Sequence, residues 1–318
     1  MAQIKLEIIT LLKKNEWISG EDIANHLHIS RTAVWKHIQQ IKKKGYQISA
    51  IPNKGYHIDQ SPNLLTIEEI NQYLDTTIIG SKIYHLSSVD STNNYAKKIA
   101  KNNENEGTVI IADEQTGGRG RKQRPWLSPK GGLWFSILLR PSIPPNRAMI
   151  VTMCSACAIA EAIKQQTSCN PSIKWPNDIL INNKKVCGIL TELSAEIDKI
   201  NYLIVGIGLN ANNEVPQSLK SIATSLLKET GSTIDLVSLF VSILSSLEQL
   251  YKALANDDIS LIRETWIRYS STLGSIIKVE TEKEEMRGTA IGLGENGELI
   301  VQTPKGEKKI ITGDITYL

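Results

Sequence analysis

The twelve residues from Gln115 to Trp126 form the segment of this chain best suited to chemistry, reading Gln-Thr-Gly-Gly-Arg-Gly-Arg-Lys-Gln-Arg-Pro-Trp. Three of them are glycines and four are cations, and no acid lies among them. Glycine lets the backbone approach a ligand closely, and arginine offers a planar set of donors suited to carboxylate or phosphate oxygens. Cations at this density repel one another, so a binding role requires an anion. The segment predicts an anion-binding loop; a solvated basic surface loop and an RGG-like nucleic-acid segment are the alternatives.

Three further segments carry polar groups at the ends of apolar runs. Asp90-Ser-Thr-Asn93 precedes a helix-like run, Lys174-Trp-Pro-Asn-Asp178 is followed by Lys184-Lys-Val-Cys-Gly188, and Gly206-Ile-Gly-Leu-Asn210 ends an apolar strand. Each has an ordinary structural explanation alone: a helix cap, a turn and a strand exit.

In this order and spacing, however, the four segments resemble the biotin–protein ligases, and the resemblance covers essentially the whole chain. It implies a reaction in two steps. Biotin and MgATP give biotinyl-5′-adenylate and pyrophosphate, and the adenylate then acylates one lysine of a biotin carboxyl carrier protein. The basic amino-terminal module matches the bifunctional branch of the family, which also represses transcription.

The resemblance also implies roles for single residues. Adenylation brings a carboxylate against a phosphate, so both anions need neutralising. Lys185 matches the lysine between them, with Arg119, Arg121 and Lys174 as further catalytic cations, and Asp178 matches a carboxylate that binds Mg²⁺. The matching biotin-binding positions are Ser91, Thr92, Asn93, Gln115, Gly118, Arg119, Gly120, Arg121, Lys185 and Gly188. The matching positions for ATP and the adenylate are Arg119, Arg121, Arg124, Trp126, Asn177 and Asn210.

The chain departs from the family pattern at Gln123, where many members carry glycine. The run Lys122-Gln-Arg-Pro125 is therefore stiffer and bulkier than the usual loop, which puts its mobility in doubt.

The amino-terminal residues predict a DNA-binding module. Apolar spacing indicates helices near Ile4–Leu12, Ile23–Leu27 and Val34–Ile41, which is a helix-turn-helix pattern. The alternation from Tyr46 to Ile58 indicates a β-hairpin wing. Residues 1–60 carry nine Lys/Arg and five Asp/Glu, whereas the whole chain has a net charge of only +3, so the positive charge suits a polyanionic partner. The predicted DNA-binding residues are Ser30, Arg31, Thr32, Trp35, Lys36, Gln39 and Lys54.

Length and patterning predict an α+β protein of several domains. We expect a winged helix-turn-helix over 1–63, a linker (Ser61-Pro-Asn63) with a short helix over 64–80, a mixed-sheet catalytic domain over 81–272 and a small β-barrel over 273–318. The resemblance implies the class II synthetase/biotin ligase type for the catalytic domain and the Src-homology-3 type for the barrel.

No apolar run of membrane-spanning length and no signal peptide is visible, and four cysteines are too few for a disulfide framework. We expect a cytoplasmic protein with no membrane partner, in which Cys154 and Cys157 are small core residues rather than metal or redox groups.

The expected partners follow from the resemblance: a carrier domain of acetyl-CoA carboxylase or pyruvate carboxylase, operator DNA, and a second copy of the chain when ligand is bound. Three alternatives remain open at this point. The chain could be a lipoate–protein ligase on the same scaffold, a transcription factor that senses biotin without catalysis, or a ligase whose amino-terminal module no longer represses.

Overall fold

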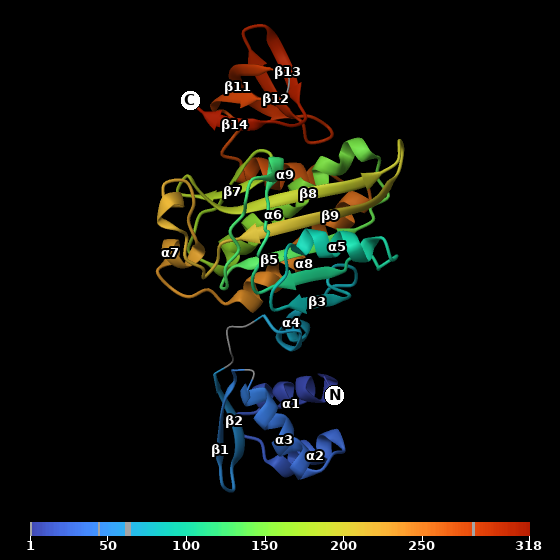
Figure 1. Ribbon diagram of the computed structural model, residues 1–318, viewed down its shortest axis with the longest axis vertical. Coiled ribbons are helices and arrows are strands. Elements are labelled where there is room, and N and C mark those ends of the chain that lie inside the picture. The colour runs from blue at the N-terminus through green and yellow to red at the C-terminus, as the bar shows by residue number, and fades with distance from the viewer. Residues whose placement is uncertain (1, 44, 61–64, 282–283) are drawn as a thin grey trace. The chain divides into compact units, whose positions relative to one another are not determined.

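The computed structural model describes residues 2–43, 45–60, 65–281 and 284–318 (Figure 1). The chain forms two compact units. The first comprises Met1–Leu74 with Asp235–Val237, and the second comprises Asp75–Ile234 with Ser238–Leu318.

The first unit contains the predicted helix-turn-helix and its wing. A buried apolar cluster that includes Ile8, Ile23, Val34 and Ile38 joins its first three helices. The Ser19 side chain accepts the Asp22 N–H and caps the second helix, as its sequence suggested. The elements are α1 (Ala2–Lys14), α2 (Gly20–Leu27), α3 (Arg31–Lys43), the antiparallel pair β1 (Gln47–Ile51) and β2 (Gly55–Gln60), and α4 (Ile67–Tyr73).

Helix α4 packs against the winged helix module. Its Glu69 is buried, forms an ion pair with Lys13 at 2.5 Å and accepts a hydrogen bond from the Tyr46 hydroxyl. The helix therefore joins the first unit, although the sequence had placed it in a connecting segment over 64–80. The expected linker at Ser61–Asn63 lies outside the described residues.

A mixed seven-stranded sheet forms the centre of the second unit, in the order β3-β4-β5-β9-β8-β7-β6. Only the β3–β4 pair is parallel. The strands are β3 (Ile83–Leu86), β4 (Val109–Ala112), β5 (Leu133–Leu139), β6 (Ser172–Lys174), β7 (Asp178–Ile181), β8 (Lys184–Ala195) and β9 (Ile200–Leu209). This confirms the α+β prediction; the short strands β3 and β6 were not predicted.

Helices cover both faces of this sheet. Figure 1 shows α5 (Thr92–Ala100) on the near face and α6 (Ala148–Gln166), α8 (Leu236–Ala255) and α9 (Ser260–Tyr269) behind it. Ala96 and Ala100 of α5 pack against Ile110, Leu138 and Ile204 of the sheet. A short helix, α7 (Leu226–Thr230), follows the loop after β9.

Helix α6 is long and apolar enough to cross a membrane by length and composition alone. In the fold every residue from Ile150 to Ile163 except Glu161 is buried, and the helix contacts α9 and β8. It is therefore the central core helix of the second unit. Cys154 and Cys157 are free and buried within it, and burial raises the pKa of both thiols well above the usual value, which confirms them as core residues.

The second unit ends in an antiparallel five-stranded sheet of order β13-β12-β11-β10-β14. Its strands are β10 (Ile276–Glu280), β11 (Glu285–Leu293), β12 (Leu299–Thr303), β13 (Gly306–Ile310) and β14 (Asp314–Tyr317). The sequence predicted the first four. Strand β14 was missed because it is only four residues long and directly follows Gly313.

Candidate functional site

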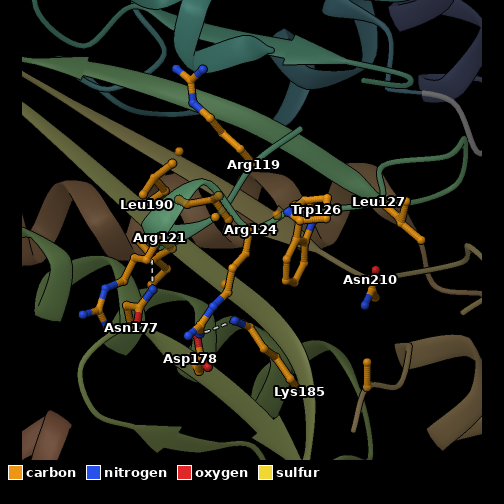
Figure 2. A pocket seen from close by; sticks show the side chains of 18 of the residues that line it. Arg119, Arg121, Arg124, Trp126, Leu127, Asn177, Asp178, Lys185, Leu190 and Asn210 are labelled. Carbon is orange, nitrogen blue, oxygen red and sulfur yellow. Dashed lines mark hydrogen bonds and ion pairs between the residues drawn. The ribbon is translucent and has the colours of Figure 1, made fainter. Parts of the chain in front are cut away.

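A cavity of about 380 Å³ lies in the second unit, where the basic loop folds over the ends of the central strands (Figure 2). It is lined by the start of α5, the loop over 115–129, the β7–β8 hairpin, strand β9, the loop over 210–223 and the start of β14. The four sequence segments that suggested chemistry therefore meet in one place.

One end of the cavity is lined by small polar groups at the beginning of α5. The Gln115 side-chain oxygen accepts the backbone N–H and the hydroxyl of Thr92, at 2.9 and 3.1 Å. The Ser136 hydroxyl lies 2.7 Å from Thr92 Oγ1 and 2.6 Å from Asn93 Oδ1. Ser91 occupies the N-cap position, but its side chain makes no capping bond. These buried hydroxyls and amides are already oriented by the protein, as a binding site for a small polar group requires.

Glycines form the floor next to these groups. Gly188 of β8 and Gly208 of β9 are paired in register, and the indole of Trp126 lies against both. A Cβ on Gly208 would stand 2.4 Å from Trp126 Nε1, and one on Gly188 would stand 3.2 Å from the same ring. The indole nitrogen is buried and has no hydrogen-bond partner among the residues that the structure describes. The glycines are therefore required for the close approach of Trp126.

Lys185 and Asp178 face each other on neighbouring strands at the centre of the site (Figure 2). The ammonium of Lys185 lies 2.6 Å from Asp178 Oδ1 and 5.1 Å from the centre of the Trp126 ring. Both side chains are less than one-third exposed. The end of the lysine side chain thus lies between a carboxylate and an aromatic face.

The cations at the tip of the basic loop converge on one carboxylate that the sequence analysis did not foresee. Asp314 of β14 lies 3.6 Å from Arg121, 3.1 Å from Lys122 and 2.7 Å from Arg124. Burial alone would raise the pKa of Asp314, but hydrogen bonds from Lys122 and Arg124 and the charge of Arg121 outweigh it and hold that pKa below its usual value. The fold itself therefore supplies an anion to the loop.

Arg119 lies apart from the other cations. Its guanidinium donates to Asn94 Oδ1 at 2.6 Å and lies 3.7 Å from Glu192, and Figure 2 shows it directed away from Lys185. In the described part of the chain, its buried Nε finds no hydrogen-bond partner. The sequence grouped Arg119 with Arg121; the structure separates their side chains.

Lys174 also lines the cavity, near Tyr317 of β14. Its ammonium lies 5.1 Å from the centre of the Tyr317 ring. Burial lowers its pKa, and the charge of Lys185 acts in the same direction against the opposing effect of Asp178. Lys174 is therefore near enough to contribute positive potential to the centre of the site.

The two asparagines expected at the nucleotide already have protein partners. Asn177 donates to the Ile189 carbonyl at 2.6 Å and accepts from Arg121 at 3.4 Å. Asn210 donates to the Thr224 carbonyl at 3.1 Å, and its oxygen accepts from Asn213 at 3.0 Å. Both line the cavity, and these contacts fix their orientation.

The remaining expected residues of the loop, Gly118 and Gly120, form backbone hydrogen bonds that shape it. The Gly118 carbonyl accepts a hydrogen bond from the Trp126 N–H at 2.9 Å, and the Gly120 N–H donates to the Arg124 carbonyl at 2.8 Å. Lys122 and Gln123 have positive φ angles of 54° and 58°. This is the conformation that glycine adopts without strain, so the departure from the family pattern at Gln123 falls where a glycine would fit.

Within the described residues no cluster of three or more metal-ligating side chains is present. Asp178 is the expected metal carboxylate, and its Oδ1 is buried with no hydrogen-bond partner apart from the ion pair to Lys185. A hard cation that shares its coordination with substrate phosphates and water needs only one or two protein carboxylates.

The predicted DNA-binding residues lie on the winged helix of the first unit. The Ser30 hydroxyl accepts the Ala33 N–H at 3.1 Å and caps α3. Trp35 of the same helix is 52% exposed, which is unusual for so large an apolar side chain. Lys54, in the turn of the wing, lies 5.6 Å from the centre of the Trp17 ring. Arg31, Thr32 and Lys36 are exposed, and Gln39 is half-buried.

Three residues of the site were missed from the sequence: Ser136, Glu192 and Asp314. Ser136 carries the only signal that could have identified it, because it is the one polar residue in the apolar run Leu133–Leu139. Glu192 binds Asn93 at 2.7 Å and Lys97 at 2.5 Å, which only the strand register reveals.

Comparison with known proteins agrees with this arrangement. The HTH domain model matches residues 5–57, the biotin/lipoate A/B protein ligase family matches residues 86–210, and the biotin protein ligase C terminal domain matches residues 272–316. The chain is 39% identical to the bifunctional ligase/repressor BirA of Bacillus subtilis (strain 168), over 98% of each protein. It is 28% identical to the Escherichia coli (strain K12) protein of the same name, over 98% of this chain and 97% of the other.

Among solved structures, the biotin protein ligase from Aquifex aeolicus in complex with biotin and ATP matches with a TM-score of 0.66 at 33% identity. The match covers 75% of this chain and 99% of the other.

Proposed function

The chain belongs to the biotin protein ligase family, and we propose that it joins biotin to ATP as biotinyl-5′-adenylate, transfers the biotin to a lysine of a carrier protein and represses transcription through its winged helix. The convergence of Lys185, Asp178 and Trp126 between a polar pocket and two oriented asparagines supports this most directly.

The cavity has the groups that each part of the adenylate needs. The ureido ring of biotin requires short hydrogen-bonding groups, which Ser91, Thr92, Asn93 and Gln115 supply next to the glycine floor. The adenine requires a flat apolar surface and amide groups at its edge, which Trp126, Asn177 and Asn210 supply. The acyl phosphate would then lie near Lys185, between these two ends.

Lys185 is the main catalytic residue in this mechanism. The biotin carboxylate attacks the α-phosphorus of ATP, an acyl phosphate bond forms, and pyrophosphate leaves. Two anions must meet in this step, so a fixed cation that contacts both lowers the barrier. Arg121 adds positive charge at the phosphate, and Lys174 raises the local potential. In the second step the carrier lysine attacks the acyl carbon and AMP leaves.

We assign Mg²⁺ to Asp178. The buried Asp178 Oδ1, whose partner is the Lys185 ammonium at 2.6 Å, fits a hard cation completed by phosphate oxygens. A bound Mg²⁺ would neutralise phosphate charge and withdraw electrons from the leaving pyrophosphate. Asp178 now holds Lys185, so binding of the metal would release the lysine towards the substrates.

The partners and finer architecture follow from the same assignment. We propose a biotin carboxyl carrier domain as the acceptor, operator DNA as the target of Ser30–Gln39 and Lys54, a homodimer when the adenylate is bound, and a cytoplasmic location. We also propose the class II synthetase type for the catalytic domain and the Src-homology-3 type for the terminal sheet. The contacts of Glu69 favour a first domain boundary after Leu74, and we keep the second at 272/273.

Pyrophosphate release tests the enzymatic proposal. Purified protein with biotin and MgATP is expected to release pyrophosphate, and Lys185→Ala is expected to lose most of it while remaining folded. Lys184→Ala is the matched control, because Lys184 is the neighbouring strand residue and does not line the cavity. Equal loss in both variants, or none in either, would contradict the role of Lys185.

Substrate and regulation need separate assays. If lipoate is transferred to a carrier domain more readily than biotin, the result would support the alternative of a lipoate–protein ligase. If neither biotin nor lipoate leads to release of pyrophosphate, the result would favour a transcription factor that senses its ligand without catalysis. Sedimentation and operator binding with and without biotin and ATP test repression: equal dimer fraction and equal affinity in both states would remove the ligand-dependent switch and leave the ligase assignment unaffected.

A further inference from the structure

The tip of the basic loop is held by the carboxyl-terminal sheet. Arg121, Lys122 and Arg124 each form an ion pair with Asp314 of β14, and Arg121 also donates to Thr312 Oγ1 at 3.2 Å. About 190 residues separate the loop from this strand in the sequence, so the contact closes the cavity from a distant part of the chain.

The backbone of the loop is built to present these cations together. The Gly120 N–H bonds to the Arg124 carbonyl at 2.8 Å, and the Arg124 N–H bonds to the Arg121 carbonyl at 3.2 Å. The turn between them is tight and includes the positive φ angles of Lys122 and Gln123. Without a counter-ion, three cations on such a turn would repel one another and favour an open loop.

We propose that Asp314 is a latch that holds the basic loop closed over the cavity, both before ligand binds and while the adenylate is retained. The role is that of a positioning residue, since Asp314 acts through the loop cations. The inference rests on the proposed function for its ligand, but the contact itself is independent of any activity.

The placement of Asp314 distinguishes it from an ordinary surface acid. Isolated exposed ion pairs contribute little, but here one carboxylate with 24% side-chain exposure receives three cations and lines the cavity. Its pKa is held below the usual value by those cations, so it is charged throughout the neutral range. A network of this kind is more effective than its pairs taken singly.

Limited proteolysis of the full chain without ligand tests the latch directly. Trypsin cleaves after Arg121 and Lys122 only when the loop opens, because a protease needs an extended, accessible backbone. We expect Asp314→Asn to speed this cleavage about tenfold, which corresponds to about 1.4 kcal/mol. Glu307→Gln is the matched control, since Glu307 is an exposed acid of the same sheet. Equal cleavage rates in wild type and Asp314→Asn would overturn the proposal.

Retention of the adenylate tests the second half of the latch. Preformed adenylate is trapped on the protein, and its release is followed after dilution. We expect Asp314→Asn and Lys122→Gln each to speed release severalfold. The double variant is expected to be no faster than Asp314→Asn, because loss of the Asp314 carboxylate already removes the Lys122 ion pair together with those of Arg121 and Arg124. Lys130→Gln, an exposed lysine outside the cavity, is expected to behave as wild type. Additive effects, or unchanged release, would refute the latch.

The two proposals fail in different ways. If wild type releases no pyrophosphate, the ligase assignment fails while the trypsin result still decides whether Asp314 holds the loop. If pyrophosphate is released normally but Asp314→Asn changes neither cleavage nor retention, the latch fails alone. Asp314→Glu, which keeps the charge, is expected to restore most of the protection; a variant as labile as Asp314→Asn would contradict the electrostatic origin.

Discussion

A methyl group at Gly206 is expected to displace Asn93 and break the hydrogen bonds at the polar end of the cavity. A Cβ there would stand 2.2 Å from Asn93 Oδ1 and 2.8 Å from its Cγ. Gly206 lies within strand β9, paired with Ser136 on one side and Leu190 on the other, so the backbone has little freedom to move. The Asn93 amide must therefore leave its position in Gly206→Ala.

The cost can be worked out from the bonds that Asn93 would lose. Its Oδ1 lies 2.6 Å from the Ser136 hydroxyl, and its Nδ2 donates to Glu192 at 2.7 Å and to the Leu190 carbonyl at 3.4 Å. A neutral hydrogen bond contributes roughly 1 kcal/mol and one to a charged group roughly 1.5–3 kcal/mol. Neglecting the long bond, the free energy of unfolding is expected to fall by about 3 kcal/mol.

The double variant Gly206→Ala/Asn93→Ala distinguishes a clash with Asn93 from destabilisation of β9 by any side chain at position 206. Truncation of Asn93 removes the same bonds and also removes the obstacle, so the added methyl is then accommodated. The double variant is expected to match Asn93→Ala within about 0.5 kcal/mol. Gly292→Ala in β11 is the control, because a Cβ on Gly292 would meet its nearest neighbour, the Ile300 side chain, at 3.9 Å.

The assays are urea denaturation and calorimetric titration with biotin. Gly206→Ala is expected to weaken biotin binding at least tenfold, since the displaced amide enters the cavity, whereas Gly292→Ala leaves binding unchanged. Fully additive losses in the double variant, about 6 kcal/mol in all, would refute the geometric explanation. Normal biotin affinity in Gly206→Ala would show that Asn93 lies outside the biotin site.

Three other predictions follow from single contacts. The pKa of Glu248 is lowered to about 2: burial would raise it, but bonds from Lys252 and from the N–H groups of 77–79 prevail. Stability from this group is present above about pH 4.5 and lost as the pH falls towards 2, so Glu248→Gln is expected to flatten acid denaturation over that range; an unchanged profile would contradict it. Asp178→Asn is expected to raise the Mg²⁺ concentration for half-maximal pyrophosphate release at least tenfold, and an unaltered Mg²⁺ dependence would remove the metal assignment. Gln123→Gly is expected to raise the free energy of unfolding by roughly 0.5–1 kcal/mol, because Gln123 has a positive φ; a decrease in urea denaturation would refute this.

The sequence predicted the main elements wherever a period or a turn residue marked them. The buried runs of β5 and β9 and the long apolar helix α6 are unambiguous. The short strands β6 and β14 each bury a single side chain, which is too little to leave a pattern. The extent of the first unit was also hidden, because the burial of Glu69 against Lys13 and Tyr46 depends on contacts about 20 to 60 residues away.

The sequence predicted the cationic residues of the candidate site but not the acidic residues Asp314 and Glu192 that pair with them. Arg121, Lys185 and their neighbours stand in short motifs whose composition indicates their chemistry. Their partners Asp314 and Glu192 are single acids in unrelated strands, and nothing local distinguishes them from solvated surface acids. Only the strand register brings Glu192 to Arg119, and only the position of β14 brings Asp314 to the cavity.

The ion pairs between Asp314 and the loop cations change the contribution that the ligand is expected to make to ordering the loop. A loop with four cations and no acid needs an anion, and the sequence alone assigns that anion to the substrate. In the fold Asp314 fills the requirement beforehand, as Asp178 does for Lys185. Substrate phosphate therefore meets cations that are already gathered, so less of its binding energy is needed to order them. When the phosphate enters, it competes with Asp314 and Asp178 for the same cations. The relative strength of the two sets of ion pairs then determines how slowly the adenylate dissociates.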